Sequence, residues 1–408
     1  MKHDRTASSH SAGPGAAAAR PLRRAGVLAL ALLTALLGAF APLSGCGGGV
    51  GEGGTGYASG PITGFGSVIV NEIVFDDSEA VVEDGDGGTR ARTDLRLGMT
   101  VEIDSNAIVD GGARASKVRY ESALVGPVES VEADGFVALG QRVVVDENTV
   151  FDSDLAAGLT SIAVGQVVEV YGLFDGGLGR LRATRVERRT TVAAYRVRAL
   201  VDELRVVAGT TVLRVGSALF AYGPASSPPA DLAAGRYVRL FVSTAAPGPL
   251  GRYEVLRFGE ALRALPDIDG VSIKGHVNAF TSLSDLRVDG RPVDASLAVV
   301  SGGTLGLGAR VEAFGRWRSG VLLATRVSVR SDQFERDRGF ELRGPVESLA
   351  ADRSSMRLRG ITVGLARPAL RYEGGTAADL SEGRLVEVRG ILAPGDGTRI
   401  DALLVKFR

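Results

Sequence analysis

The stretch GPVESVEADG, at Gly126–Gly135, is nearly repeated as GPVESLAADR at Gly344–Arg353. Three motifs recur in the same order along the chain. The first is Gly-Pro followed by a β-branched residue, at 60–62, 126–128 and 344–346, with Gly-His-Val at 275–277 as a variant. The second is a glycine followed by an alternating apolar and polar run, which begins at Gly98, Gly165, Gly235, Gly308 and Gly383. The third is Ala-x-x-Val, at 115–118, 183–186, 324–327 and 402–405.

The spacing of the second motif indicates the kind of repeat. Its glycines recur every 67 to 75 residues, whereas solenoid repeats have periods of about 20–50 residues. A unit of this length can bury a core of its own, so we expect tandem small domains. Five units are predicted, at 59–122, 123–190, 191–264, 265–332 and 333–408. The third is degenerate, and the charged segment Arg330–Phe340 is expected to be a linker to the last unit.

Hydrophobic periodicity predicts the structure within each unit. In the second unit, FVALGQRVVVD at 136–146 alternates apolar and polar residues around a turn, as two strands of a hairpin do. Two further strands and a short helical piece at 154–165 follow. We therefore expect an all-β fold, a tandem array of about five small OB-like β-barrels of ~70 residues each. An immunoglobulin-type sandwich is not expected, because it needs about seven strands and 100 residues.

Composition and charge limit the classes of partner. Hydrophobic residues make up 45% and charged residues 23% of the 408-residue chain, which is typical of folded domains. Without residues 1–45 the chain has 42 basic and 46 acidic side chains, a net charge of about −4. Proteins that bind nucleic acid usually carry a basic excess. A nucleic-acid partner is therefore not expected.

The N-terminal segment has the pattern of an export signal. Arg20, Arg23 and Arg24 precede an apolar run at Val27–Phe40, which is too short to span a membrane comfortably. The run is followed by Leu43-Ser44-Gly45-Cys46. This sequence resembles the lipobox of bacterial lipoproteins, with an aliphatic residue and two small residues before a cysteine.

The lipobox resemblance implies a lipid anchor. A signal peptidase would recognise Leu43, Ser44 and Gly45, and Cys46 would carry a diacylglycerol; no other cofactor is expected. Cys46 is the only cysteine in the sequence, so it cannot form an intramolecular disulfide. An ordinary secretory signal with an incidental cysteine is the alternative. Residues 1–45 are thus expected to be a signal peptide and residues 46–58 a flexible glycine-rich tether. Glycine after the lipobox cysteine implies, in many Gram-negative bacteria, an outer-membrane location, on the periplasmic side or at the surface.

The repeat also resembles a known family. The first unit, GPITGFGSVIVNEIVFDDSEAVVEDGDGG from Gly60, and the GPV and VEV motifs of the other units are similar to domain of unknown function 5666, found in tandem in proteobacterial lipoproteins. No activity is assigned to that family. The resemblance therefore implies architecture and location, and it transfers no functional residue.

Few residues in the sequence suggest catalysis. His276 is the only histidine after residue 45, and its position in a strand opening predicts a residue at the barrel rim rather than a general base. Nothing in the sequence resembles a G-x-S-x-G nucleophile motif, and the expected zinc and haem ligands are missing. Carboxylates are plentiful, so a glycosidase pair stays an alternative. We expect a protein that is not an enzyme.

Two glycine-rich turns resemble ligand-binding loops. The turn at 83–88, EDGDGG, places Asp84 and Asp86 where a hard cation could bind, although such residues also favour tight turns for conformational reasons. The segment 64–67, GFGS, has neither the lysine nor the following helix of a phosphate-binding loop. We interpret it as a bend in a barrel with Phe65 packed inward. No metal or nucleotide site is therefore predicted, with Asp84 and Asp86 as weak calcium candidates.

These observations favour a non-catalytic, lipid-anchored protein of the cell envelope. Its tandem β modules would act as a binding or spacer array for protein or glycan, because linked modules gain avidity. One alternative is an envelope polysaccharide hydrolase that uses paired carboxylates. The other is an adhesin-like spacer stiffened by calcium at its acidic turns.

Overall fold

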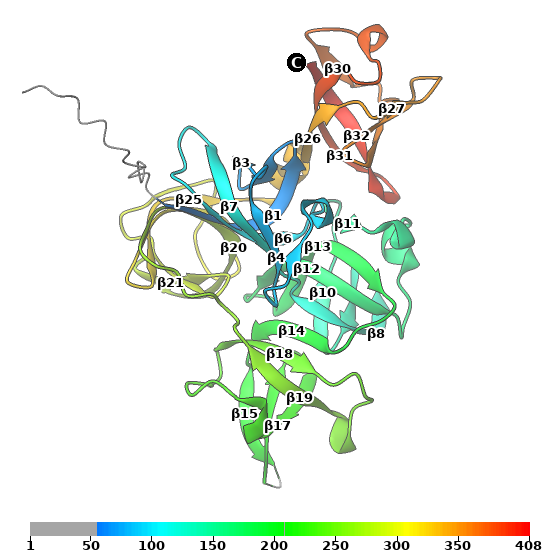
Figure 1. Ribbon diagram of the computed structural model, residues 1–408. Coiled ribbons are helices and arrows are strands. Elements are labelled where there is room, and N and C mark those ends of the chain that lie inside the picture. The colour runs from blue at the N-terminus through cyan, green and yellow to red at the C-terminus, as the bar shows by residue number, and fades with distance from the viewer. Residues whose placement is uncertain (1–54, 208) are drawn as a thin grey trace, which may run out of the picture. The chain divides into compact units, whose positions relative to one another are not determined.

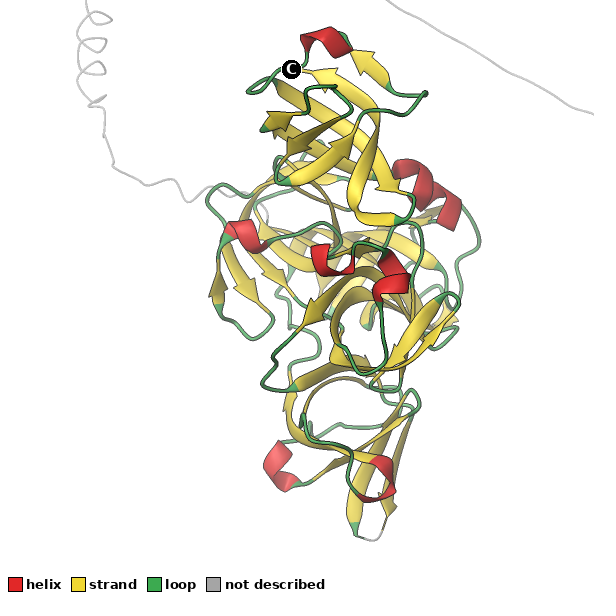
Figure 2. Ribbon diagram, turned by 90° about the vertical axis from the view of Figure 1, so that its right-hand side faces the viewer, coloured by secondary structure: helices red, strands yellow, loops and turns green. Residues whose placement is uncertain are grey.

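The computed structural model describes residues 55–207 and 209–408. The expected signal peptide, the lipobox residues Leu43, Ser44, Gly45 and Cys46, and most of the tether lie outside the described residues. The described chain is almost entirely β, with one α-helix, α1 (Asp332–Arg338), and a few short 3₁₀ turns (Figures 1 and 2). Within these residues, no helix has the length and apolarity needed to cross a bilayer.

The strands form five barrels in chain order (Figure 1). Barrel 1 consists of β1 (Gly56–Phe65), β2 (Val68–Val70), β3 (Ile73–Asp76), β4 (Val81–Asp84), β5 (Thr89–Arg90), β6 (Thr100–Ser105) and β7 (Gly112–Tyr120). Barrel 2 consists of β8 (Leu124–Glu132), β9 (Gly135–Ala138), β10 (Gln141–Val144), β11 (Val150–Phe151), β12 (Val167–Asp175) and β13 (Arg180–Arg189). Barrel 3 consists of β14 (Tyr195–Leu200), β15 (Glu203–Val207), β16 (Thr210–Val215), β17 (Ala218–Tyr222), β18 (Tyr237–Val242) and β19 (Arg252–Gly259).

The last two barrels flank helix α1. Barrel 4 consists of β20 (Ile268–Ser282), β21 (Asp285–Val288), β22 (Arg291–Asp294), β23 (Val299–Ser301), β24 (Arg310–Arg318) and β25 (Val321–Val329). Barrel 5 consists of β26 (Phe340–Pro345), β27 (Ser348–Leu349), β28 (Ser355–Leu358), β29 (Ile361–Gly364), β30 (Arg371–Glu373), β31 (Leu385–Ala393) and β32 (Asp396–Phe407). The segment expected to be only a linker thus contains the helix.

Barrel 2 shows the strand order that the barrels share. β8 pairs antiparallel with β9 at one end and with β12 at the other, and β9 pairs with β10. The sheet closes through a parallel pair between β10 and β13 and an antiparallel pair between β12 and β13. This is the connectivity of a five-stranded Greek-key barrel. The predicted all-β fold of small OB-like barrels is confirmed.

One hydrogen-bond exchange explains why the first two motifs recur together. Val128 donates its N–H to the carbonyl of Gln166 and accepts from the N–H of Gly165, both at 2.8 Å. The same exchange joins four other pairs: Ile62 with Gly98, Val201 with Gly235, Val277 with Gly308, and Val346 with Gly383. Each of these glycines has φ between +78° and +84°, a conformation that L side chains rarely adopt. The third unit keeps the exchange although it lacks the Gly-Pro sequence.

The opening motif lies inside the first strand and not at its start. Pro127 occupies the fourth position of β8, and Pro61 the sixth position of β1. In barrel 1 the first strand changes partner at this point, from β6 to β2. A missing N–H costs little at such a transition.

The barrels do not bury five separate cores. Buried apolar side chains form one cluster in barrels 1 and 5 that includes Val150 and Tyr171 of barrel 2, a second in barrels 2 and 3, and a third in barrel 4. Valine, leucine and alanine are the commonest residues among the buried apolar side chains. Tyr57 from barrel 1 belongs to the barrel 4 cluster and is completely buried. The prediction that the tether extends to residue 58 is therefore wrong for residues 56–58, because these residues lie in β1.

Strand pairs also join barrels that are distant in sequence. β1 pairs in parallel with β20 of barrel 4 over Gly56–Ser59, and with β26 of barrel 5 at Gly64–Phe65. A Cβ at Gly64 would overlap the carbonyl oxygen of Glu341. The glycine of the GFGS segment therefore permits close approach of the fifth barrel, a role that the bend interpretation did not include. β8 and β14 join barrels 2 and 3.

Candidate functional site

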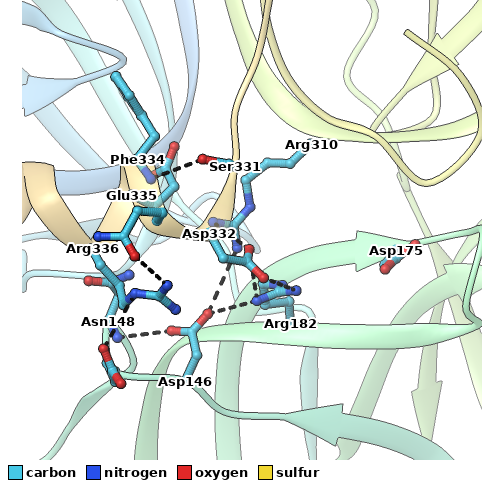
Figure 3. Close-up of polar contacts among 12 residues, drawn as sticks. Asp146, Asn148, Asp175, Arg182, Arg310, Ser331, Asp332, Phe334, Glu335 and Arg336 are labelled. Carbon is cyan, nitrogen blue, oxygen red and sulfur yellow. Dashed lines mark hydrogen bonds and ion pairs between the residues drawn. The ribbon is translucent and has the colours of Figure 1, made fainter. Parts of the chain in front are cut away.

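Helix α1 carries charged side chains toward three other barrels. The helix begins after Ser331, whose hydroxyl accepts the N–H of Phe334 at 3.1 Å, as an N-cap residue does. Acidic residues lie in its first turn and basic residues in its last turn, which suits the helix dipole. Figure 3 shows Asp332 beside Arg182 of barrel 2, and Glu335 forms an ion pair with Lys274 of barrel 4.

Lys274 and Glu335 form a buried ion pair at this place. The Nζ of Lys274, on β20, lies 2.7 Å from Oε2 of Glu335, and the two side chains are 3% and 13% exposed. Burial lowers the pKa of Lys274, and Glu335 opposes this only in part. Burial would raise the pKa of Glu335, but the attraction and hydrogen bond of Lys274 outweigh it, so that pKa lies below its ordinary value. The pair therefore favours the charged form of Glu335, whereas burial works against the charged form of Lys274.

A second set of charges, centred on Asp332, lies near this pair (Figure 3). Nη1 of Arg182 lies 2.9 Å from Oδ2 of Asp146 and 3.3 Å from Oδ1 of Asp332. Arg310 faces the same two carboxylates at the longer distances of 3.9 and 3.7 Å. Burial lowers the pKa of Arg310. We call these six residues the α1 junction: Asp146, Arg182, Lys274, Arg310, Asp332 and Glu335.

The α1 junction encloses little free space. A cavity of about 50 Å³ is lined by Lys274, Arg310, Glu335 and Asp146, together with apolar and hydroxyl groups of barrels 1 and 2. Such a volume accommodates a few water molecules at most. The junction has equal numbers of cationic and anionic side chains. Its geometry is therefore that of a contact that holds barrels together, rather than of a substrate cleft.

His276 was predicted at the barrel rim, and the structure shows a buried side chain near the junction. Its side chain is buried within β20, and Nδ1 lies 3.0 Å from the carbonyl oxygen of Gly308. In the described part of the chain, Nε2 has no hydrogen-bond partner. Burial lowers the pKa of His276. Gly308, whose carbonyl the ring contacts, itself approaches Asp175 and Gly177 of barrel 2, so the neighbouring barrel covers this end of β20.

The acidic turn of barrel 1 forms a second junction. Asp84 accepts the N–H groups of Asp86 and Gly88 at 3.0 and 2.8 Å and the Nε–H of Arg90 at 2.8 Å. Burial would raise the pKa of Asp84, but these hydrogen bonds outweigh it and the pKa lies below its ordinary value. The calcium candidates Asp84 and Asp86 thus form a turn with internal hydrogen bonds.

Asp86 itself contacts barrel 3. Its carboxylate lies 3.1 Å from Arg239, 3.4 Å from Arg196 and 3.5 Å from Arg257. Arg239 also donates to the carbonyl of Gly85 at 2.8 Å. Among residues 55–207 and 209–408, no group of three or more histidine, cysteine or acidic side chains is arranged to hold a metal ion. The turn that we considered for calcium therefore holds three arginines.

A third junction connects barrels 1 and 4. Arg291 donates to the hydroxyl of Tyr57 at 3.0 Å and to Glu102 at 2.6 Å. Arg263 adds contacts to Glu102 at 3.0 Å and to Asp104 at 2.6 Å. Burial raises the pKa of Tyr57, so the hydroxyl stays neutral.

Larger hollows lie between the barrels. A groove of about 810 Å³ follows the acidic turn and contains Tyr120, Glu169, Arg196, Phe241 and Arg257. The guanidinium of Arg257 stacks on the ring of Phe241, with its carbon 3.2 Å from the ring centroid. Another hollow, of about 600 Å³, lies between barrels 3 and 4. Volumes of this size suit small ligands or short oligomers.

Two segments of this chain match one family. The model of Domain of unknown function (DUF5666) matches residues 125–187 and 343–405. These ranges correspond to barrels 2 and 5, the barrels that contain the two copies of the opening stretch. No curated protein matches the chain. Tandem repetition of this domain is thereby shown, whereas the match carries no activity.

Sequence reasoning found the turns but missed the junctions. The structure brings Asp84 and Asp86 together and adds three arginines from barrel 3. Lys274 could have been found, because it is one of three lysines after residue 45 and lies in an apolar strand, VSIKGHV. Its partner Glu335 could not, because the two residues lie in different units.

The stabilisation contributed by Glu335 is expected to disappear in acid. A carboxyl group with a lowered folded pKa stabilises the fold above its unfolded value, here 4.5, and loses that effect as pH falls through the folded value. The thermal midpoints of the wild type and Glu335→Gln should differ at about pH 7, and the difference should shrink as pH falls below the unfolded value. The measurement is calorimetry of both proteins across this range. A difference that stays constant in acid would contradict the assignment.

Proposed function

We propose that this protein is a non-catalytic, lipid-anchored scaffold of the outer membrane, whose barrels together bind protein or glycan. The observation that carries the proposal is the set of buried contacts between barrels distant in sequence. Lys274 of barrel 4 pairs with Glu335 before barrel 5, and Arg291 of barrel 4 pairs with Glu102 of barrel 1. A flexible spacer would have no need of such contacts.

The grooves between barrels support a binding role. The groove beside the acidic turn combines the aromatic side chains Tyr120 and Phe241 with carboxylate and guanidinium groups. Sugars pack on aromatic rings and hydrogen-bond to planar polar groups, and OB-type barrels bind oligosaccharides in several proteins. Because the groove has residues from barrels 1, 2 and 3, it would be lost if the barrels separated.

The lipid anchor is tested by metabolic labelling with a palmitate analogue. The wild type should be labelled and recovered with outer membranes, and Cys46→Ala should be unlabelled and released. Because Cys46 is the only cysteine, it is the only residue to which a lipid can be attached through a thioether, and loss of the label in Cys46→Ala identifies it as the site. A wild-type protein that stays unlabelled would overturn the anchor.

Binding is tested by retention of the purified protein on isolated envelope glycans. Tyr120→Ala should reduce retention, whereas Tyr222→Ala, at another partly buried tyrosine outside this groove, should not. Equal retention of both variants and the wild type would show that the groove is not the binding site.

A further inference from the structure

Barrel 4 differs from the other barrels in one segment. Between β22 and β24, residues 295–309 (ASLAVVSGGTLGLGA), which contain the short strand β23, include no charged side chain. The corresponding segments of barrels 1, 2 and 5, at 77–97, 145–164 and 365–382, each contain several, and the segment at 223–234 in barrel 3 contains Asp231. Segments at a barrel surface are usually polar, because they face water.

The uncharged segment exposes its apolar side chains. Leu297 is 92% exposed, Val299 70% and Val300 37%. Leu283 and Leu323 are also exposed, and they lie on adjoining backbone. The N–H of Ala295 donates to the carbonyl of Leu283 at 2.7 Å.

Strand register completes the surface. Leu323 of β25 is opposite Asp294 at the end of β22, and Val299 of β23 is opposite Arg326 of the same β25 strand. We call Leu283, Leu297, Val299, Val300 and Leu323 the barrel 4 apolar patch. A leucine exposed at a turn contributes nothing to the core, and grouped exposed apolar side chains commonly mark a surface that meets an apolar partner.

The position of the N-terminus indicates what that partner is. Gly56–Ser59 of β1 pairs directly with Gly270–Ile273 of β20 in barrel 4 (Figure 1). Cys46 lies nine residues before Thr55, and nine residues span at most about 30 Å. A lipid on Cys46 would therefore keep barrel 4 close to the bilayer.

Register places the patch at the same level along barrel 4 as that N-terminal strand, although its strands β22, β23 and β25 are not paired with β20. Val271 of β20 is opposite Gly315 of β24, and Gly315 is opposite Ala324 of β25. Ala324 follows Leu323 of the patch, so the patch and the start of β1 lie at similar positions along the barrel. An acidic segment here would be repelled by anionic headgroups, and barrel 4 is the barrel whose segment has no charge.

We propose that the barrel 4 apolar patch rests on the bilayer surface, with Leu297 and Val299 among the headgroups. This inference rests on the lipid anchor of the proposed function. Interfacial binding grows with the apolar area that enters the headgroup region. The lipid would hold the protein at the membrane, and the patch would fix which face of it meets the bilayer.

The test uses an environment-sensitive fluorophore on a single introduced cysteine. Because acylated Cys46 leaves no other thiol, Leu297→Cys can be labelled alone in the full lipidated protein. The matched control is Val206→Cys, at an apolar side chain of barrel 3 that is 73% exposed. Both proteins are reconstituted into vesicles of phosphatidylethanolamine and phosphatidylglycerol, with and without brominated lipid.

The label at position 297 should shift to shorter wavelength and lose at least half of its emission to brominated lipid, while the label at 206 stays water-like. Equal, water-like emission at both positions in protein that carries the palmitate analogue overturns the inference and leaves the anchor standing. A shift seen in whole envelopes but not in vesicles assigns the patch to a protein partner and also overturns it. Protein without the palmitate label overturns the anchor and this inference with it. Thermal unfolding of both variants checks that the fold is unchanged.

Discussion

Replacing Glu335 by alanine is expected to lower the free energy of unfolding of the α1 junction by about 3–5 kcal/mol. The change leaves the ammonium group of Lys274, whose side chain is 3% exposed, buried without its carboxylate. The loss of stability comes mainly from the unpaired buried charge, because a single hydrogen bond contributes less to the free energy of unfolding. Hydrogen exchange resolved by peptide is the suitable measurement, because different barrels can open separately. Protection should fall in β20 and in α1.

Two controls separate the buried charge from a general loss of contact. Glu373→Ala removes the carboxylate of a Lys–Glu pair whose side chains are 40% and 56% exposed, and it should cost less than about 1 kcal/mol. The double variant Lys274→Met/Glu335→Leu removes both charges and should recover most of the loss. If Glu335→Ala costs no more than Glu373→Ala, the pair does not hold the junction.

The fold could be predicted from the sequence because its determinants are local. Alternation at period two defines the strands, and the glycines at the second motif need a backbone conformation that other residues avoid. Gly165 and Val128 lie in the same barrel and are joined by a hydrogen bond. The recurrence of both residues at a fixed spacing is therefore enough to predict this contact in every unit. Even the degenerate third unit keeps it through Val201 and Gly235.

The junctions could not be predicted because they join side chains from separate barrels. Tyr57 belongs in sequence to the expected tether, yet its ring packs in barrel 4 beside Arg291. His276 takes the position of proline in other openings, which suggested the rim, but contact with a neighbouring barrel buries it. The contacts of Asp86 could not be predicted for the same reason, because its three arginine partners come from barrel 3. Periodicity within a unit contains no information on such contacts.

Gly98 is a repeated glycine that forms a turn within its own barrel and also contacts a neighbouring barrel. Its φ is +78°, close to the +84° of Gly165 and the +80° of Gly383. A Cβ at Gly165 or Gly383 would meet no atom within 4 Å, whereas a Cβ at Gly98 would overlap the carbonyl oxygen of Thr184 in barrel 2. The hydroxyl of Thr184 also donates to the carbonyl of Gly98 at 2.6 Å. Gly98 is thus both a turn residue and an inter-barrel contact.

Alanine at Gly165 or Gly383 should cost about 1–2 kcal/mol, because only the left-handed conformation is penalised. Gly98→Ala should cost about 1–3 kcal/mol more, because the backbone of β13 must also move. Hydrogen exchange should show the difference in location as well as in size. Gly165→Ala and Gly383→Ala should weaken protection in their own barrels, and Gly98→Ala should weaken it in β6 and β13 together. Equal effects for all three, confined to one barrel each, would mean that barrel 1 does not depend on barrel 2 at this contact.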